Sequence, residues 1–251
     1  MAAAGAVVLA SARIGSAQGA QPAGQAQPSA KPATAQEVMQ KTLAAYSAAK
    51  TYQGSWSYTL EQGEGQTKQV QKMVIDVTSR APNHLAFRVA PAPGQKPLPD
   101  GQPLPELRVI VDGQTAWFEN TSDKSFYKVA LPKNAAISPL MFMPLIPSAS
   151  QVERKEDVQA DGKTLIVLAA ATQQGGVGRM EIDASNYHIR RVSTEALVGL
   201  TKVSSAITMD KETFDGAVPD NAFAWKPARG LKEMPAPPEA AALFGPPDPG
   251  K

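Results

Sequence analysis

The chain has 251 residues, with 25 Lys and Arg against 23 Asp and Glu, and neither sign forms a run. A nucleic-acid-binding protein normally shows a basic stripe and an enzyme for acidic substrates a basic cluster, so the composition favours neither class. The absence of cysteine excludes a disulfide framework, a thiolate nucleophile and a lipid-modified cysteine anchor.

The N-terminal segment has features of an export signal. Residues 2–10 form a short apolar run, far below the ~20 residues that a membrane helix needs. Gly15-Ser16-Ala17 then offers small residues at the positions that a signal peptidase reads. We therefore expect residues 1–17 to be a signal peptide and the mature protein to be soluble and periplasmic. A flexible cytoplasmic tail is the alternative, because no basic residue precedes the apolar run.

Residues 18–33 consist almost entirely of Ala, Gln, Pro and Gly, which predicts a disordered linker. One medium-sized domain is expected over residues 34–230, and a Pro-rich flexible tail over residues 231–251. The domain opens with a helix, because Thr34-Ala-Gln-Glu37 fits a capping box. The apolar face of this helix is formed by Val38, Thr42, Ala45, Tyr46 and Ala49.

Beyond the helix the apolar period changes from about 3.6 to 2, which indicates half-buried β-strands. Asp112-Gly113 and Asp161-Gly162 each stand between two such runs and are strong hairpin signals. We predict a mainly β (α+β) domain of about eleven short antiparallel strands in a large curved sheet or barrel. Strands are expected near residues 52–61, 71–77, 85–89, 107–111, 114–119, 126–129, 152–158, 164–169, 178–182, 187–192 and 201–209, with Phe223 and Trp225 closing the domain.

Two segments interrupt the alternation. Residues 91–105 contain six prolines, so they cannot form a central strand and predict a surface excursion. Residues 139–147 (Pro-Leu-Met-Phe-Met-Pro-Leu-Ile-Pro) are strongly apolar and uncharged. An exposed segment of this kind is a liability, so it is interpreted as a lid that packs on the sheet.

Few residues suggest chemistry. His84 and His188 have no ligand at metal-binding spacing, and Gly162-Lys163-Thr164 lies in a predicted hairpin rather than in a phosphate-binding loop. There is no Gly-x-Ser-x-Gly elbow and no evident carboxylate pair for acid–base chemistry. We expect a protein that is not an enzyme, with no catalytic residue, no metal, no cofactor and no nucleic-acid partner.

Apolar surface is the remaining functional signal. A β core accounts for much of it, but it explains the apolar segment 139–147 poorly. Methionines suit a surface that meets varied chains. The candidate lipid-binding residues are Trp56, Tyr58, Met73, Ile75, Phe87, Trp117, Met141, Phe142, Met143 and Leu145.

Three stretches together resemble the periplasmic lipoprotein carriers of the LolA/LolB type. Residues 80–87 (Arg-Ala-Pro-Asn-His-Leu-Ala-Phe) are similar to the family's Arg-Pro-Asn before an aromatic strand. Residues 109–120 (Val-Ile-Val-Asp-Gly-Gln-Thr-Ala-Trp-Phe-Glu-Asn) are similar to its central hairpin. Residues 218–230 are similar to its closing Phe-x-Phe-x-Pro-Pro-x-Gly. The chain departs from the family at Ala81, Ala228 and the insert 91–105.

The resemblance implies an unclosed antiparallel β-barrel whose concave apolar face, capped by helices, takes up acyl chains. It also implies that Arg80 latches the lid closed. Two functions remain open: a monomeric carrier or chaperone that shields acyl chains of a lipid or lipoprotein and delivers them to an acceptor protein or membrane, and a sensing or interaction module that recognises a lipid or polypeptide. No transmembrane or signalling segment is visible in the sequence, which favours the carrier.

Overall fold

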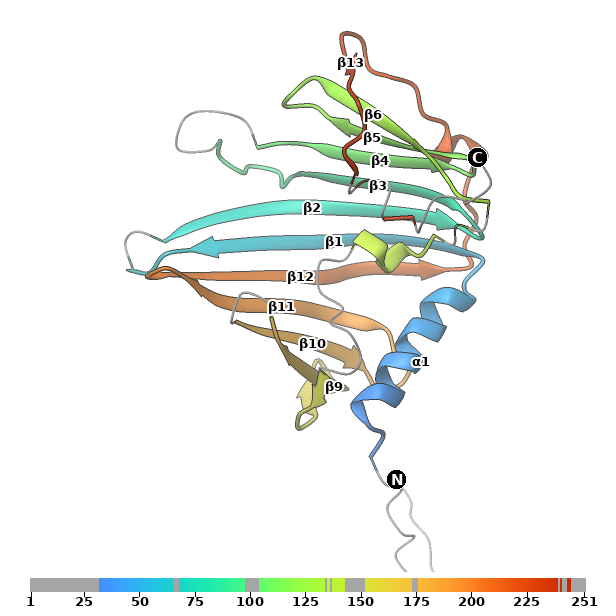
Figure 1. Ribbon diagram of the computed structural model, residues 1–251. Helices are drawn as coiled ribbons and strands as arrows, with labels where there is room; N and C mark the ends of the chain where they lie inside the picture. Colours follow the sequence, from blue (N-terminus) through green and yellow to red (C-terminus); the bar gives the residue numbers. More distant parts are fainter. Residues whose placement is uncertain are drawn as a thin grey trace, which may run out of the picture. The chain divides into compact units, whose positions relative to one another are not determined.

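The computed structural model describes residues 32–65, 68–97, 104–133, 135, 137–142, 152–172, 176–238, 240 and 243–244. The expected signal peptide, and the expected linker as far as residue 31, lie outside these ranges. Within the described residues the chain is mainly β, with thirteen strands in one sheet that curves without closing (Figure 1). The predicted fold class is confirmed.

Among the described residues, the sheet is accompanied by helix α1 and by the short 3-10 helices η2 and η4. The elements in chain order are α1 (Ala35–Ala48), β1 (Thr51–Gln62), β2 (Gln69–Arg80), β3 (His84–Pro91), β4 (Leu107–Asp112), β5 (Thr115–Asn120), β6 (Ser125–Ala130), η2 (Pro139–Phe142), β7 (Val152–Arg154), β8 (Val158–Ala160), β9 (Lys163–Ala171), β10 (Val177–Asp183), β11 (Ile189–Val198), β12 (Thr201–Phe214), η4 (Asp220–Phe223) and β13 (Lys232–Glu233).

The sheet consists of two antiparallel meanders joined at its centre. Strands β1 to β6 follow one another on one side, and β7 to β12 on the other, in the order β13-β6-β5-β4-β3-β2-β1-β12-β11-β10-β9-β7, with β8 also paired to β9. The last long strand, β12, pairs with β1 over almost the whole length of both strands. The chain must therefore pass from one edge at β6 to the other edge at β7. On the way, η2 contacts β2 and lies in front of the central strands in the view of Figure 1.

Helix α1 begins as the sequence predicts. The Thr34 side chain accepts a hydrogen bond from the Glu37 backbone N–H, and the Glu37 carboxylate accepts one from the Thr34 backbone, which completes the capping box. The buried side chains of α1 are Val38, Met39, Thr42 and Tyr46. Their spacing turns one stripe of the helix toward the sheet.

We call the face of the sheet that carries α1 and η2 the inner face. Strand alternation and register assign one set of side chains to it. These residues form the main apolar core, which includes Trp56, Ile75, Val77, Leu85, Phe87, Val109, Phe118, Leu168, Met180, Val192, Ile207 and Met209.

The C-terminal segment corrects one expectation. A flexible tail was predicted from residue 231, yet Lys232–Glu233 form β13 in parallel with β6, and the Phe244 side chain is buried against Phe118, with ring centroids 6.0 Å apart. Proline content suggested a loose chain, but the edge of β6 pairs with residues 232–233, and Phe244 leaves water by packing on Phe118.

One smaller expectation is also corrected. The strand predicted over residues 152–158 is two short strands, β7 and β8, which both pair with β9. Of the two residues expected to close the domain, Phe223 ends η4, and Trp225 lies on the face opposite to the inner face, where it stacks on Trp117 at 4.3 Å between ring centroids.

Candidate functional site

The inner face is the candidate binding site. Tyr52, Trp56 and Tyr58 follow one another on the inner side of β1, because successive side chains of a strand alternate between faces. Trp56 is completely buried, whereas Tyr58 is half-buried. The covering of the inner face by the described residues is therefore dense near α1 and thinner toward the other end of the strands.

A tight approach fixes the buried end of this face. Trp56 Nε1 donates a 2.9 Å hydrogen bond to the Tyr52 hydroxyl, and this bond passes over Gly54. A Cβ atom at residue 54 would lie only 2.6 Å from Trp56 Nε1, so a side chain at residue 54 would have to push the two aromatic rings apart. The close approach of Tyr52 and Trp56 therefore requires glycine at position 54.

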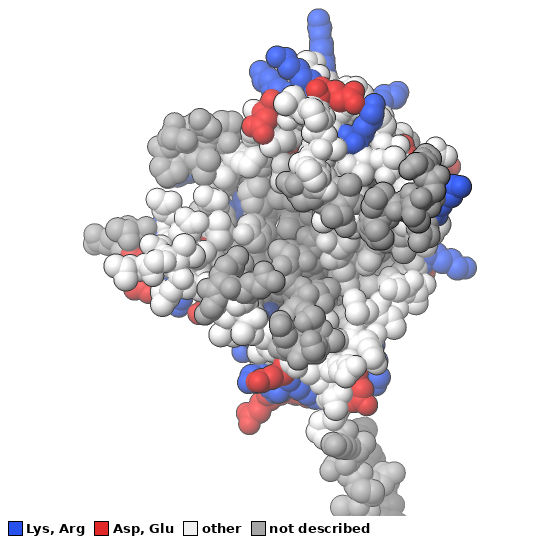
Figure 2. Space-filling model, viewed as in Figure 1, with Lys and Arg blue, Asp and Glu red and all other residues white. Residues whose placement is uncertain are grey.

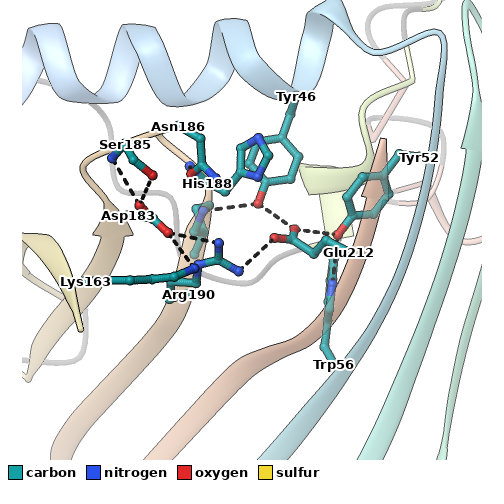
Figure 3. A network of polar contacts seen from close by, with 11 residues as sticks. Tyr46, Tyr52, Trp56, Lys163, Asp183, Ser185, Asn186, His188, Arg190 and Glu212 are labelled. Atoms are coloured by element: carbon teal, nitrogen blue, oxygen red, sulfur yellow. Dashed lines mark hydrogen bonds and ion pairs between the residues drawn. The ribbon is translucent and has the colours of Figure 1, made fainter. Parts of the chain in front are cut away.

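A buried polar network joins α1 to the sheet (Figure 3). The Glu212 side chain of β12 is only 4% exposed, and one of its oxygens accepts hydrogen bonds from the hydroxyls of Tyr46 (2.7 Å) and Tyr52 (2.9 Å). The Tyr46 hydroxyl also accepts the Ile189 backbone N–H at 3.2 Å. Burial, followed by the negative charge of Glu212, raises the pKa of both tyrosines far above the ordinary range, so both stay neutral donors.

The network continues to Asp183 at the end of β10. Its carboxylate is 2% exposed and contacts Arg190 and Lys163, each at 3.0 Å, as well as the Ser185 backbone N–H and hydroxyl. Burial alone would raise the pKa of Asp183, but the hydrogen bonds and ion pairs outweigh it and hold that pKa far below its usual range. We assign this network a structural role, because the Glu212 and Asp183 side chains are only 4% and 2% exposed and contact other side chains of the protein.

The thinly covered end of the inner face contains a pocket of about 190 Å³ between β4, β5 and β6. The pocket is formed mainly by apolar side chains of the inner face. The residues around it are Leu107, Arg108, Val109, Phe118, Glu119, Asn120, Ser125 and Tyr127. Phe118 and Tyr127 stack at 4.7 Å between ring centroids and make a flat aromatic wall. An alkyl chain could lie against such a wall without leaving a polar group unpaired.

In Figure 2, most of the Lys, Arg, Asp and Glu side chains that can be seen lie around the margin of the molecule. A second pocket, of about 500 Å³, lies between the start of β2 and the Pro-rich insert.

Most of the predicted site residues that the structure describes share the inner face. Met73, Ile75 and Phe87 are buried there with Trp56, and Tyr58 and Met141 are half-buried against the same core. For Phe142 only the backbone is described, as the last residue of η2, and Met143 and Leu145 lie outside the described residues.

Trp117 was expected in the site but lies on the outer face. It pairs across the sheet with Ile110 and Lys128, and it stacks on Trp225. Its neighbour Phe118 occupies the inner position instead, together with Tyr127, and both were missed. Because Trp117 and Phe118 are adjacent in a strand, one ring must lie on each face of the sheet. The neighbouring strand is apolar at Val109, Ile110 and Val111, so its pattern does not indicate which of the two rings faces inward.

Arg80 also requires a correction. It was expected to meet the lid, but alternation turns Ser79 inward and Arg80 outward. Among the described residues its guanidinium pairs with Asp220 of η4 at 2.5 Å and lies 5.0 Å from the centre of the Phe223 ring. Arg80 therefore attaches the segment after β12 to the outer face.

The described residues offer neither a metal site nor a membrane-spanning helix. No group of three or more His, Cys, Asp or Glu side chains among them is arranged to hold a metal ion. No described helix has both the length and the apolar composition that crossing a membrane requires.

The chain resembles several solved structures at low sequence identity. No family model and no curated protein matches the chain. Among solved structures, an uncharacterised conserved protein from Thermus thermophilus is 12% identical with a TM-score of 0.47, covering 80% of this chain and 99% of the other. A LolA superfamily protein from Nitrosomonas europaea is 9% identical with a TM-score of 0.32, covering 77% of this chain and 99% of the other. MucB in the MucA/MucB complex from Pseudomonas aeruginosa is 13% identical with a TM-score of 0.42, covering 76% and 61%.

Proposed function

We propose that this protein is a non-enzymatic binding protein that takes up an acyl chain of a lipid or lipoprotein on the inner face of its sheet. The observation that carries the proposal is the thinly covered, apolar end of that face, where Phe118, Tyr127 and Val109 line a pocket. Burying each methylene of an alkyl chain is worth ~0.8 kcal/mol, so a chain lying from this pocket toward Tyr58 would gain enough for micromolar binding after the costs of association.

The residue types at this end fit an acyl chain better than a polar ligand. Tyr58, Leu60, Val89 and Tyr127 are all half-buried and present apolar surface beyond the packed core. A sugar or nucleotide would need several fixed donors and acceptors pointing into the site. Three buried donors under α1 already have partners: the Tyr46 and Tyr52 hydroxyls bond to Glu212, and Trp56 Nε1 bonds to Tyr52. We propose export to the periplasm as the setting for this activity.

The experiment is titration of the purified domain with a fluorescent fatty acid. Tyr58→Asp should weaken binding at least about tenfold, because a charge on the inner face must be desolvated when the chain binds. Thr59→Asp is the matched control: residue 59 is the next residue of β1, is also half-buried and faces outward, so its substitution should leave affinity unchanged. Absence of saturable binding by the wild type would refute the proposal, as would equal losses in both variants.

A further inference from the structure

Exposed apolar side chains gather at one end of the sheet. Nine large apolar side chains are exposed among the described residues, and three of them lie on α1 and in the C-terminal segment. The other six are Val70, Leu107, Val177, Leu197, Val198 and Leu200, which we call the apolar rim. They share one end because β2, β4 and β10 begin there and the antiparallel strand β11 ends there.

The most prominent part of the rim is the turn between β11 and β12. Leu197 is 69% exposed, Val198 61% and Leu200 completely, and Gly199 makes the turn with a φ of 64°. No charged residue stands between Ala196 and Thr201. The tip of a hairpin normally carries polar residues. Three exposed aliphatic side chains within four positions therefore indicate a surface that binds an apolar partner.

Charge at the same end favours an anionic partner. Three carboxylates near the rim are already paired: Glu61 with Lys68, Glu106 with Arg88 and Glu195 with Lys202. Lys72 and Lys96 are exposed, line the larger pocket beside Val70, and form no ion pair with any described residue. Two ammonium groups are therefore available close to the exposed apolar side chains.

We propose that the apolar rim inserts into the surface of an anionic lipid bilayer, with Lys72 and Lys96 facing the headgroups. A protein partner fits poorly, since a stable protein interface buries roughly 1,200–2,000 Å² in one continuous patch. The rim is instead two separate groups at strand ends, with β1 between them. A bilayer accepts separate protrusions, because each apolar side chain leaves water independently and lysines gain from anionic lipid.

The apolar rim lies beside the pocket of the inner face, where a membrane would have to dock to receive an acyl chain. Leu107 belongs both to the rim and to the lining of the inner-face pocket, so docking would bring the thinly covered end of the inner face to the membrane. This purpose rests on the proposed function, whereas membrane binding by the rim does not. The two can therefore fail separately.

The experiment is flotation of the intact protein with vesicles of phosphatidylethanolamine and phosphatidylglycerol, compared with pure phosphatidylcholine. Wild type should float with the anionic vesicles. Leu197→Ser/Leu200→Ser should lower the bound fraction at least about tenfold, because both side chains would no longer leave water. Leu43→Ser is the matched control, since Leu43 is exposed on α1, away from the strand ends, and its loss should change nothing. Lys72→Glu/Lys96→Glu should reduce binding to anionic vesicles only.

A second measurement locates the contact. The chain has no cysteine, so Leu200→Cys and Gln114→Cys can each be labelled with an environment-sensitive dye. Gln114 is exposed in the β4–β5 turn at the opposite end of the sheet. Anionic vesicles should shift the emission of the dye at residue 200 to the blue and leave that at residue 114 unchanged.

Equal flotation of wild type and Leu197→Ser/Leu200→Ser, or no flotation of wild type, would overturn the proposal. Normal fatty-acid binding by the rim variants, measured without vesicles, would show that the acyl site is intact.

Discussion

Tyr46 of α1 and Glu212 of β12 are 166 residues apart in sequence, yet the Tyr46 hydroxyl donates a 2.7 Å hydrogen bond to the Glu212 carboxylate beneath the helix (Figure 3). The same hydroxyl accepts the Ile189 backbone N–H. One side chain thus attaches the helix that covers the inner face to two strands of the second meander.

Removing this attachment should loosen α1. Tyr46→Phe leaves the buried Ile189 N–H without its acceptor and removes one donor from Glu212, so we expect a loss of about 1–3 kcal/mol in the free energy of unfolding. Urea denaturation measures the loss, and hydrogen exchange should accelerate in residues 35–48. Tyr187→Phe is the control: its hydroxyl accepts only an exposed bond from Lys41, and its removal should cost under about 0.5 kcal/mol. Similar losses in both variants would contradict the role of Tyr46.

Asp183 should make stability depend on pH in the acid range. Its folded-state pKa lies far below the ordinary value of about 3.9, so its contribution is present above pH ~4 and is lost as the pH falls below that value. We expect Asp183→Asn to lower the free energy of unfolding by about 2–3 kcal/mol at pH 7. The difference from wild type should shrink between about pH 4 and pH 2. Denaturation at several pH values tests this, with the exposed turn residue Asp161→Asn as control.

The C-terminal segment should contribute to stability. Phe244 is 7% exposed and packs on Phe118, so Phe244→Ala is expected to cost about 3 kcal/mol. Leu243→Ala, at the adjacent residue with 48% exposure, should cost less than about 0.5 kcal/mol. Thermal or urea unfolding of the two variants measures these losses. Equal stability of Phe244→Ala and Leu243→Ala would instead support the flexible tail that the composition predicts.

Arg80 should behave as an outer-face residue. Its pair with Asp220 is largely exposed, with side chains 31% and 92% accessible, so a double-mutant cycle of Arg80→Leu and Asp220→Asn should give a coupling below about 1 kcal/mol. Fatty-acid affinity and release should equal those of the wild type. Faster or slower release by Arg80→Leu would instead support the latch that the family resemblance implied.

The sequence predicted those local structures that depend only on residues close together in the chain. The capping box at Thr34 and Glu37 depends on residues three apart, and the turn at Asp112-Gly113 depends on two adjacent residues, so both were predicted correctly. Alternation likewise predicted that Trp56 shares a strand face with Tyr58, and Ile75 with Met73, because their strands have polar residues between the apolar ones.

Where both faces of a strand are apolar, alternation gives no answer. Trp117 and Phe118 are adjacent in a strand whose partner is apolar at three successive positions, and only the packing of Trp225 on one side and Tyr127 on the other determines which ring enters the core. The same holds for Arg80, whose partner Asp220 is brought to it by the return of β12 alongside β1.

The sequence by itself therefore determined the class of fold, the leading helix and the apolar character of the sheet, since these follow from periodicity and from side chains a few residues apart. Only the tertiary structure decided which face binds α1, that Glu212 and Asp183 are buried with partners, and that Phe244 completes the core. The contacts of Glu212 with Tyr46 and of Phe244 with Phe118 join residues more than a hundred positions apart, and no local pattern encodes which distant segments become neighbours.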